Sequence, residues 1–226
     1  MTDTGFQMKL TQAIEDYLKK IYKLQYTEKG ATTSNIAKAM NVSSASVTNM
    51  LKRLSKMNLV DYNSYKGVTL TDTGRKTALE TIRHHRLLEL YLVEKLNYTW
   101  DEVHEEADIL EHYISEKLED RIAEVLEDPS HDPHGDPIPA KDGKMPVVDW
   151  ISMNDSEKHQ EYLIRRVREQ KPEILQYLEQ IGILPGVKVK IKEIGPFDGP
   201  ITVDIEGREE VIGNNIAGKI YLVNYE

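Results

Sequence analysis

The stretch 33–70 constrains the fold more than any other part of this sequence. It begins with a pattern for a short helix over 34–40. After a tight polar turn, a second helical pattern covers 44–57, with apolar side chains recurring on one face. Two β segments follow, over 59–62 and 68–70, on either side of a polar hairpin that contains a glycine. Two helices joined by a tight turn and followed by a hairpin are typical of a winged helix-turn-helix.

Longer helical patterns flank this stretch. Apolar side chains recur at i, i+3 and i+4 over 10–25, which predicts an amphipathic helix. After the hairpin we expect a helix over 72–96, capped by the polar residues at its start. The sequence TWDE is a capping box that opens a further helix over 100–126, bent near Ser115. Two long helices with apolar faces are suited to a dimer interface.

The last third of the chain changes character. The segment 128–149 holds five of the nine prolines, which predicts a linker. Beyond it, a strand over 161–169, a helix over 172–181 and several short β segments over 186–225 predict a small β-barrel. We therefore expect a mainly α fold with some β, in three domains: a winged helix-turn-helix over 1–75, a helical dimerisation domain over 76–148 and a β-barrel over 149–226.

The charge is divided unevenly along the chain. The net charge is −9, but residues 1–75 carry 11 Lys and Arg against 6 Asp and Glu, a balance of +5, and residues 76–226 carry −14. A basic module attached to an acidic body is expected of a DNA reader with a separate sensing or assembly region. The alternative is that acidic helices only keep one end of the molecule solvated.

The residue types that the chain lacks narrow the possible chemistry. It has no cysteine, which excludes disulfide scaffolds, thiolate zinc sites and cysteine nucleophiles. No run of about 18 apolar residues occurs, so we expect no membrane span. The first residues carry no long apolar stretch of the kind found in export signals, and we expect a cytoplasmic protein.

Imidazole and carboxylate side chains gather on the predicted helices. Four potential metal ligands share one face of the helix 100–126, within an arc of roughly 100°. They are His104, Asp108, Glu111 and His112. On the preceding helix His85 and Glu89 are one turn apart, and Asp16 on the first helix can supply one more donor. Nitrogen and oxygen donors without sulfur favour Mn²⁺ or Fe²⁺. The alternative is a solvated acidic face.

Several other residues are expected to have structural roles. His84 points about 100° away from its neighbour, so we expect it at the surface. His131 and His134 lie in the predicted linker and are not expected to bind metal. Trp100 and Trp150 are expected to anchor packing.

With these motifs identified, the sequence resembles the diphtheria-toxin-repressor family of metal-dependent regulators along essentially its whole length. The stretches that carry the resemblance are EDYLKKIY (15–22), the helix-turn-helix and hairpin through KGVTLTDTG (66–74), RHHRLLELYLVE (83–94), WDEVHEEADILEHYIS (100–115) and PHGDPIPA (133–140). In this order they are far more specific than a winged helix alone.

The resemblance implies two adjacent metal sites in each subunit, an ancillary site and a primary site. The ancillary set matches His85, Glu89 and His104, and the primary set matches Asp16, Asp108, Glu111 and His112. Iron-responsive members have methionine and cysteine at two of these positions, where this chain has Asp16 and Asp108. Hard carboxylates in their place favour the manganese-responsive branch. The family's third domain is SH3-like and can lend ligands, for which Gln170 and Glu173 are the candidates.

The resemblance also implies a homodimer that binds a palindromic operator in double-stranded DNA and represses metal-uptake genes. The second helix of the helix-turn-helix would place its polar residues at base edges and phosphates, and its basic residues would add affinity by counterion release. The candidate DNA-binding residues are Thr33, Ser43, Ser44, Ser46, Thr48, Asn49, Lys52, Arg53 and Lys66.

Two other classes of function compete with this interpretation. A metalloenzyme built on the helical pair is disfavoured because no Glu-x-x-His signature occurs and no spare acid or base stands beside an open coordination position. We therefore expect no enzymatic activity. A winged-helix regulator that responds to a non-metal ligand stays open, and its DNA binding would be indifferent to a chelator.

Overall fold

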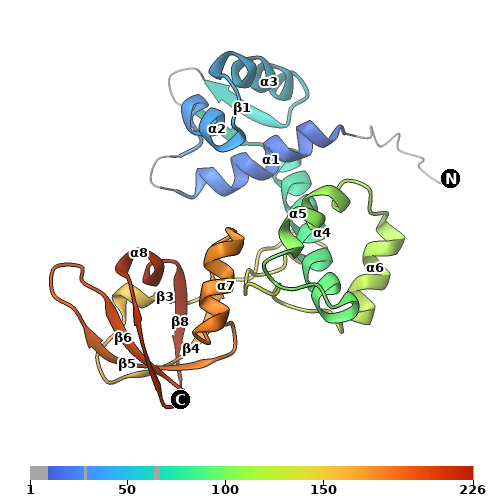
Figure 1. Ribbon diagram of the computed structural model, residues 1–226. Helices are drawn as coiled ribbons and strands as arrows, with labels where there is room; N and C mark the ends of the chain where they lie inside the picture. Colours follow the sequence, from blue (N-terminus) through green and yellow to red (C-terminus); the bar gives the residue numbers. More distant parts are fainter. Residues whose placement is uncertain (1–9, 28–29, 64–66, 226) are drawn as a thin grey trace. The chain divides into compact units, whose positions relative to one another are not determined.

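The structure is a computed structural model that describes residues 10–27, 30–63 and 67–225 (Figure 1). By internal contacts the chain divides into two units, which we describe separately. The first comprises Met1–Arg83 with Lys141–Lys144, and the second comprises His84–Ala140 with Met145–Glu226. The boundary between the units falls inside one long helix, α4, Asp72–Leu96. The expected three-domain boundaries therefore stay a prediction.

The first unit has the predicted winged helix-turn-helix. Its elements are α1 (Gln12–Gln25), α2 (Thr33–Met40), α3 (Ser44–Lys56), β1 (Val60–Asn63), β2 (Gly67–Leu70) and the first turns of α4. The hydroxyls of Thr32 and Ser43 accept amide hydrogen bonds at the starts of α2 and α3. Asn41, with φ of 53°, ends α2 in the left-handed region and begins the turn.

The start of α4 is packed tightly against the end of α3. A Cβ atom on Gly74 would lie 1.9 Å from the carbonyl oxygen of Leu59, so only glycine allows this approach. The Thr71 hydroxyl accepts the Gly74 amide hydrogen bond and donates to the carbonyl of Asn58. Because of these contacts, α4 leaves the β hairpin in a defined direction.

The helical part of the second unit differs from the prediction. The expected helix over 100–126 is two helices, α5 (Val103–Leu110) and α6 (Glu116–Val125). The Glu102 carboxylate accepts the Thr99 amide hydrogen bond, as one half of a capping box does. The chain leaves the helix after Glu111, and the Ser115 hydroxyl caps α6. Because Ser115 starts a new helix, the expected bend is a complete break.

The first part of the segment 128–149 is not the linker that its composition predicts, whereas 145–149 has no helix or strand and Val147 is fully exposed. The first part forms a loop in which Asp132, His134 and Ile138 are buried. The Asp132 carboxylate accepts amide hydrogen bonds from His134 and Asp136, both at 2.9 Å, and a β-bridge joins His131 to Pro137. The prolines and the glycine of this part therefore belong to a folded loop with its own hydrogen bonds.

The remaining elements form the predicted SH3-like β domain. They are β3 (Ile151–Ser152), a 3₁₀ turn (Met153–Asp155), β4 (Glu161–Val167), α7 (Pro172–Gln180), β5 (Lys188–Ile194), β6 (Ile201–Ile205), β7 (Arg208–Ile212), α8 (Asn214–Ala217) and β8 (Ile220–Asn224). The strands pair antiparallel in the order β3-β8-β4-β5-β6-β7, and α7 lies beside them in Figure 1. Trp100 belongs to this domain's core, which confirms it as a packing anchor. None of the described helices is long and apolar enough to cross a membrane.

Candidate metal centre and DNA-binding surface

Three predicted ligands meet where α5 packs beside α4. His85 and Glu89 lie one turn apart on α4, with His85 Nε2 2.9 Å from Glu89 Oε1. Nδ1 of His104, on α5, lies 3.1 Å from each of these two atoms. Donor atoms that bind one cation at right angles, as in octahedral coordination with bonds of about 2.1 Å, are about 3 Å apart. The spacing of the three atoms therefore fits a shared divalent cation.

The other nitrogen of His85 faces the predicted primary ligands. His85 Nδ1 lies 2.6 Å from Glu111 Oε2 and 3.3 Å from Asp108 Oδ1. Glu111 Oε1 lies 3.3 Å from His112 Nε2. A carboxylate on the second ring nitrogen fixes the tautomer and orientation of a ligating histidine. The Glu111 carboxylate can do this for His85.

Asp16, the remaining primary candidate, lies half-buried on α1 in the first unit. Its place beside Glu111 and His112 stays a prediction.

A second group of donors includes residues that sequence reasoning did not select. Glu89, Asp132 and His134 are all buried and can bring one donor atom each within 4.8 Å of the others. His134 Nδ1 lies 3.9 Å from Glu89 Oε2, while His134 Nε2 lies 2.8 Å from the Trp100 carbonyl oxygen. The motif PHGDPIPA contains His134, but its prolines indicated a linker, and only the folded loop brings this side chain to α4.

Burial and neighbouring charges set the protonation of this cluster in the metal-free protein. Burial favours the neutral form of Glu89, but the adjacent imidazoles of His85 and His104 outweigh it and hold the pKa of Glu89 well below its usual range. Burial, together with the charges of Glu89 and Asp136, raises the pKa of Asp132 well above its usual range, although Arg86 opposes this. Packed carboxylates and imidazoles of this kind are a site that a cation would stabilise.

The prediction that His84 lies at the surface is wrong. Its side chain is 11% exposed, and its Nε2 lies 3.2 Å from Glu119 Oε2. Its Nδ1 lies 3.3 Å from the Glu111 carbonyl oxygen. The break after α5 lets α6 cover this second face of α4, so a direction away from His85 still leads into the interior.

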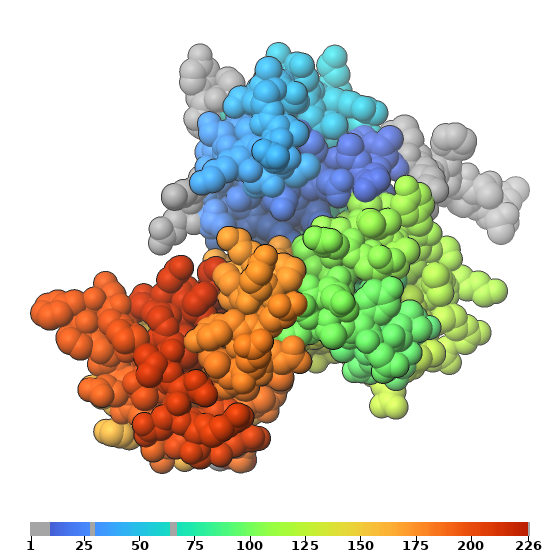
Figure 2. Space-filling view, in the orientation of Figure 1, coloured from blue at the N-terminus to red at the C-terminus, as the bar shows by residue number. Residues whose placement is uncertain are grey.

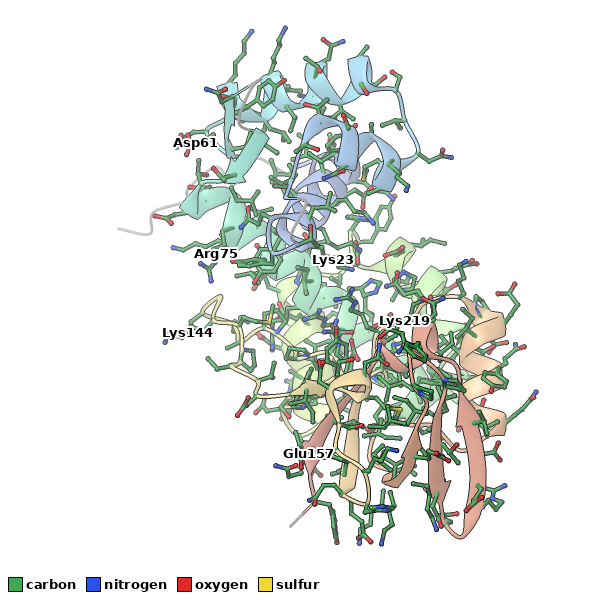
Figure 3. The ribbon with its side chains drawn as sticks, turned by 90° about the vertical axis from the view of Figure 1, so that its left-hand side faces the viewer. Lys23, Asp61, Arg75, Lys144, Glu157 and Lys219 are labelled. Carbon is green, nitrogen blue, oxygen red and sulfur yellow. The ribbon has the colours of Figure 1, made fainter. Side chains whose placement is uncertain are left out.

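The C-terminal domain brings one of its two candidates to the cluster. Gln170 Nε2 lies 3.4 Å from His104 Nδ1. The preceding residue, Glu169, accepts the amide hydrogen bond of Gln170 and pairs with Lys219, which is labelled in Figure 3. Glu173 lies exposed at the start of α7 and belongs to none of the metal-ligand groups found among the described residues.

The predicted DNA-binding residues lie mostly on the exposed face of α3. Ser44, Ser46, Asn49, Lys52 and Arg53 are exposed, and Figure 2 shows α2 and α3, in light blue, at the surface.

The remaining candidates of this set are placed differently. The Ser43 hydroxyl caps α3, and the Thr48 hydroxyl donates to the Ser44 carbonyl, so both have a structural contact as well. Thr33 is half-buried, and Lys66 lies outside the described residues.

Models of known protein families match three consecutive parts of the chain. Residues 9–68 match the model "Iron dependent repressor, N-terminal DNA binding domain", residues 71–140 match "Iron dependent repressor, metal binding and dimerisation domain", and residues 151–224 match "FeoA domain". The iron-dependent repressor IdeR of Mycobacterium tuberculosis is 30% identical over 216 residues, which cover 89% of this chain and 92% of the relative. The diphtheria toxin repressor of Corynebacterium diphtheriae is 36% identical over 135 residues, 59% of each chain.

A solved structure described as a manganese-dependent transcriptional repressor in complex with manganese superimposes with a TM-score of 0.87. It is 36% identical, and the match covers 94% of this chain and all of that one. The matches to relatives span all three predicted domains. The chain therefore belongs to the diphtheria-toxin-repressor and IdeR family of metal-dependent repressors.

Proposed function

We propose that this chain is a metal-activated transcription repressor that acts in the cytoplasm as a homodimer on a palindromic operator. It responds to Mn²⁺ in preference to Fe²⁺ and controls genes for metal uptake. The observation that carries the proposal is the cluster of His85, Glu89 and His104, whose donor atoms lie 2.9 to 3.1 Å apart. Relatives named as iron-dependent and manganese-dependent repressors support it.

The choice of Mn²⁺ rests on the donor atoms. Every candidate ligand offers imidazole nitrogen, carboxylate oxygen or amide oxygen, and the chain has no cysteine. Asp16 and Asp108 supply hard oxygen at two positions where softer donors would favour iron. The manganese complex of the structural relative agrees with this choice.

The proposed mechanism is a change in repulsion among the chain's own side chains. A bound cation supplies positive charge to the cluster. The carboxylates of Glu89, Asp108 and Glu111 then no longer repel Asp16, and α1 is held against the helices that dimerise. Because α4 runs continuously from the β hairpin to Glu89, ordering at the cluster becomes ordering of the DNA-reading helices.

The deciding experiment is a mobility shift on the DNA upstream of the protein's own gene. The protein is first treated with a chelator, and Mn²⁺, Fe²⁺ and Zn²⁺ are then titrated separately. We expect no tight binding with the chelator and half-maximal binding at the lowest concentration for Mn²⁺. Binding that ignores the chelator would instead favour a regulator of the non-metal class.

The basic residues of α3 give a second measurable property. Replacing Lys52 by alanine should lower the slope of log affinity against log salt by about 0.9 per subunit, because one phosphate contact is lost. Affinity should fall about equally for all DNA sequences. Lys95, at the end of α4, is a control of equal charge whose alanine variant should keep the wild-type slope. A slope unchanged by Lys52→Ala would show that Lys52 does not contact DNA phosphates.

A further inference from the structure

One carboxylate links α4 to the C-terminal domain. Asp136 Oδ1 lies 3.0 Å from Arg86 of α4 and 2.6 Å from Arg166 of β4. Arg86 also donates to the Pro137 carbonyl, and its Nε lies 3.7 Å from Asp132 Oδ2. All three side chains of this bridge are at most 22% exposed, so solvent screens their charges only partly.

The bridge lies beside the backbone that carries His134. The carbonyl of His134 accepts the amide hydrogen bond of Val167, the last residue of β4, at 2.9 Å. Arg166, next to it, lies 5.4 Å from the ring centroid of Tyr221 and so is held within the β domain. The loop is therefore attached to β4 by a backbone bond and by a shared carboxylate.

The same attachment determines where two donors of the metal centre lie. His134 comes from the loop, two residues before Asp136, and Gln170 follows β4 by three residues. His134 Nδ1 lies 3.9 Å from Glu89 Oε2, and Gln170 Nε2 lies 3.4 Å from His104 Nδ1. Both donors depend on the junction between loop and strand, although neither touches Asp136 in the contacts described.

We propose that Asp136 is a positioning residue of the metal centre. Its carboxylate, shared by Arg86 and Arg166, holds the C-terminal domain on the helical part of the unit and so places His134 and Gln170 at the cluster. The inference rests on the proposed function, because it assumes that this cluster binds a cation.

The first test is Mn²⁺ affinity in Asp136→Asn, measured on the full chain by the loss of the free-ion EPR signal. We expect affinity about tenfold weaker, as is typical when a group that orients a ligand is removed. Asp204→Asn is the matched control, since Asp204 pairs with Lys192 inside the same domain at 3.1 Å. It should stay within twofold of wild type. Asp136→Glu keeps the carboxylate and should recover most of the affinity.

The same substitution in a variant that lacks both donors distinguishes a role in positioning them from a general loosening of the C-terminal domain. In a protein that carries His134→Ala and Gln170→Ala, the additional change Asp136→Asn should alter Mn²⁺ affinity less than twofold, because the donors that it positions are gone. An equal tenfold loss in both backgrounds would overturn the proposal, and so would wild-type affinity in Asp136→Asn. Should that variant fold poorly, Arg166→Gln breaks the same bridge from the β4 side and carries the same expectation.

Hydrogen exchange of the metal-free protein keeps this proposal distinct from the proposed function. The Val167 amide should exchange at least tenfold faster in Asp136→Asn than in Asp204→Asn, whether or not the protein binds metal. Wild-type protein that binds no cation would overturn the proposed function. An unchanged Val167 exchange rate would overturn only the role of Asp136.

Discussion

Glu89→Gln should weaken Mn²⁺ binding by about 100-fold or more. Glu89 divides its oxygens between two groups, with Oε1 facing His85 and His104 and Oε2 facing His134. Removal of a side chain that only orients a ligand costs 10- to 100-fold in metal affinity, and replacement of a charged direct donor by a neutral amide should cost at least as much. Glutamine keeps the size of the side chain but removes its charge, so the cluster keeps its packing and loses its attraction for a cation.

Two quantities are measured: the Kd for Mn²⁺, by titration, and the concentration of Mn²⁺ that gives half-maximal DNA binding. Both should rise by the same factor, because DNA binding depends on the occupied site. Glu94→Gln is the matched control, since Glu94 lies on the same helix, is 47% exposed and pairs only at the surface with Lys95. Affinity within threefold of wild type in Glu89→Gln would show that Glu89 is not a ligand.

The elements that the sequence predicted well are those set by local patterns. The apolar periodicity that predicted α1 and the polar turn that predicted the break between α2 and α3 each lie within a few residues of the structure that they determine, and the structure confirms them. The pair His85 and Glu89 was predictable for the same reason, because helical geometry alone puts i and i+4 side by side.

The elements that the sequence did not predict depend on contacts far apart in the chain. His84 is buried because α6 returns over α4, and its partner Glu119 lies 35 positions away. A segment as rich in proline and glycine as 128–149 can be a linker or a tight loop, so its composition alone does not distinguish the two. What distinguishes the two here is that Asp132 accepts two amide hydrogen bonds inside the fold.

The candidate metal centre combines predictable and unpredictable contacts. Side chains on one helix pair could be assigned from spacing, but Asp132 and His134 reach Glu89 only through the folded loop. Gln170 reaches His104 only because β4 ends at Val167 beside that loop. Of the candidate donors outside the helices, Gln170 was suggested by the family resemblance, whereas Asp132 and His134 were identified only from the three-dimensional structure.

The contact between this loop and β4 also leads us to expect a large loss of stability from one substitution. Gly135→Ala should lower the free energy of unfolding by about 3 kcal/mol or more. Gly135 has φ of +85°, where an L side chain costs about 1–2 kcal/mol. Its added Cβ would also lie 1.9 Å from the Arg165 carbonyl oxygen and 2.8 Å from the Arg166 Cα, both backbone atoms of β4 that cannot rotate aside. The loop must therefore separate from β4, which breaks the hydrogen bond between Val167 and His134.

Gly143→Ala separates the two causes of this loss. Gly143 has φ of +79°, but its added Cβ would meet nothing within 4 Å. Its alanine variant should therefore show the backbone cost alone, about 1–2 kcal/mol. Urea unfolding with chelator present measures both variants without the contribution of bound metal. Equal losses in the two variants would mean that the loop and β4 separate freely, and that the close approach at Gly135 does not hold the C-terminal domain in place.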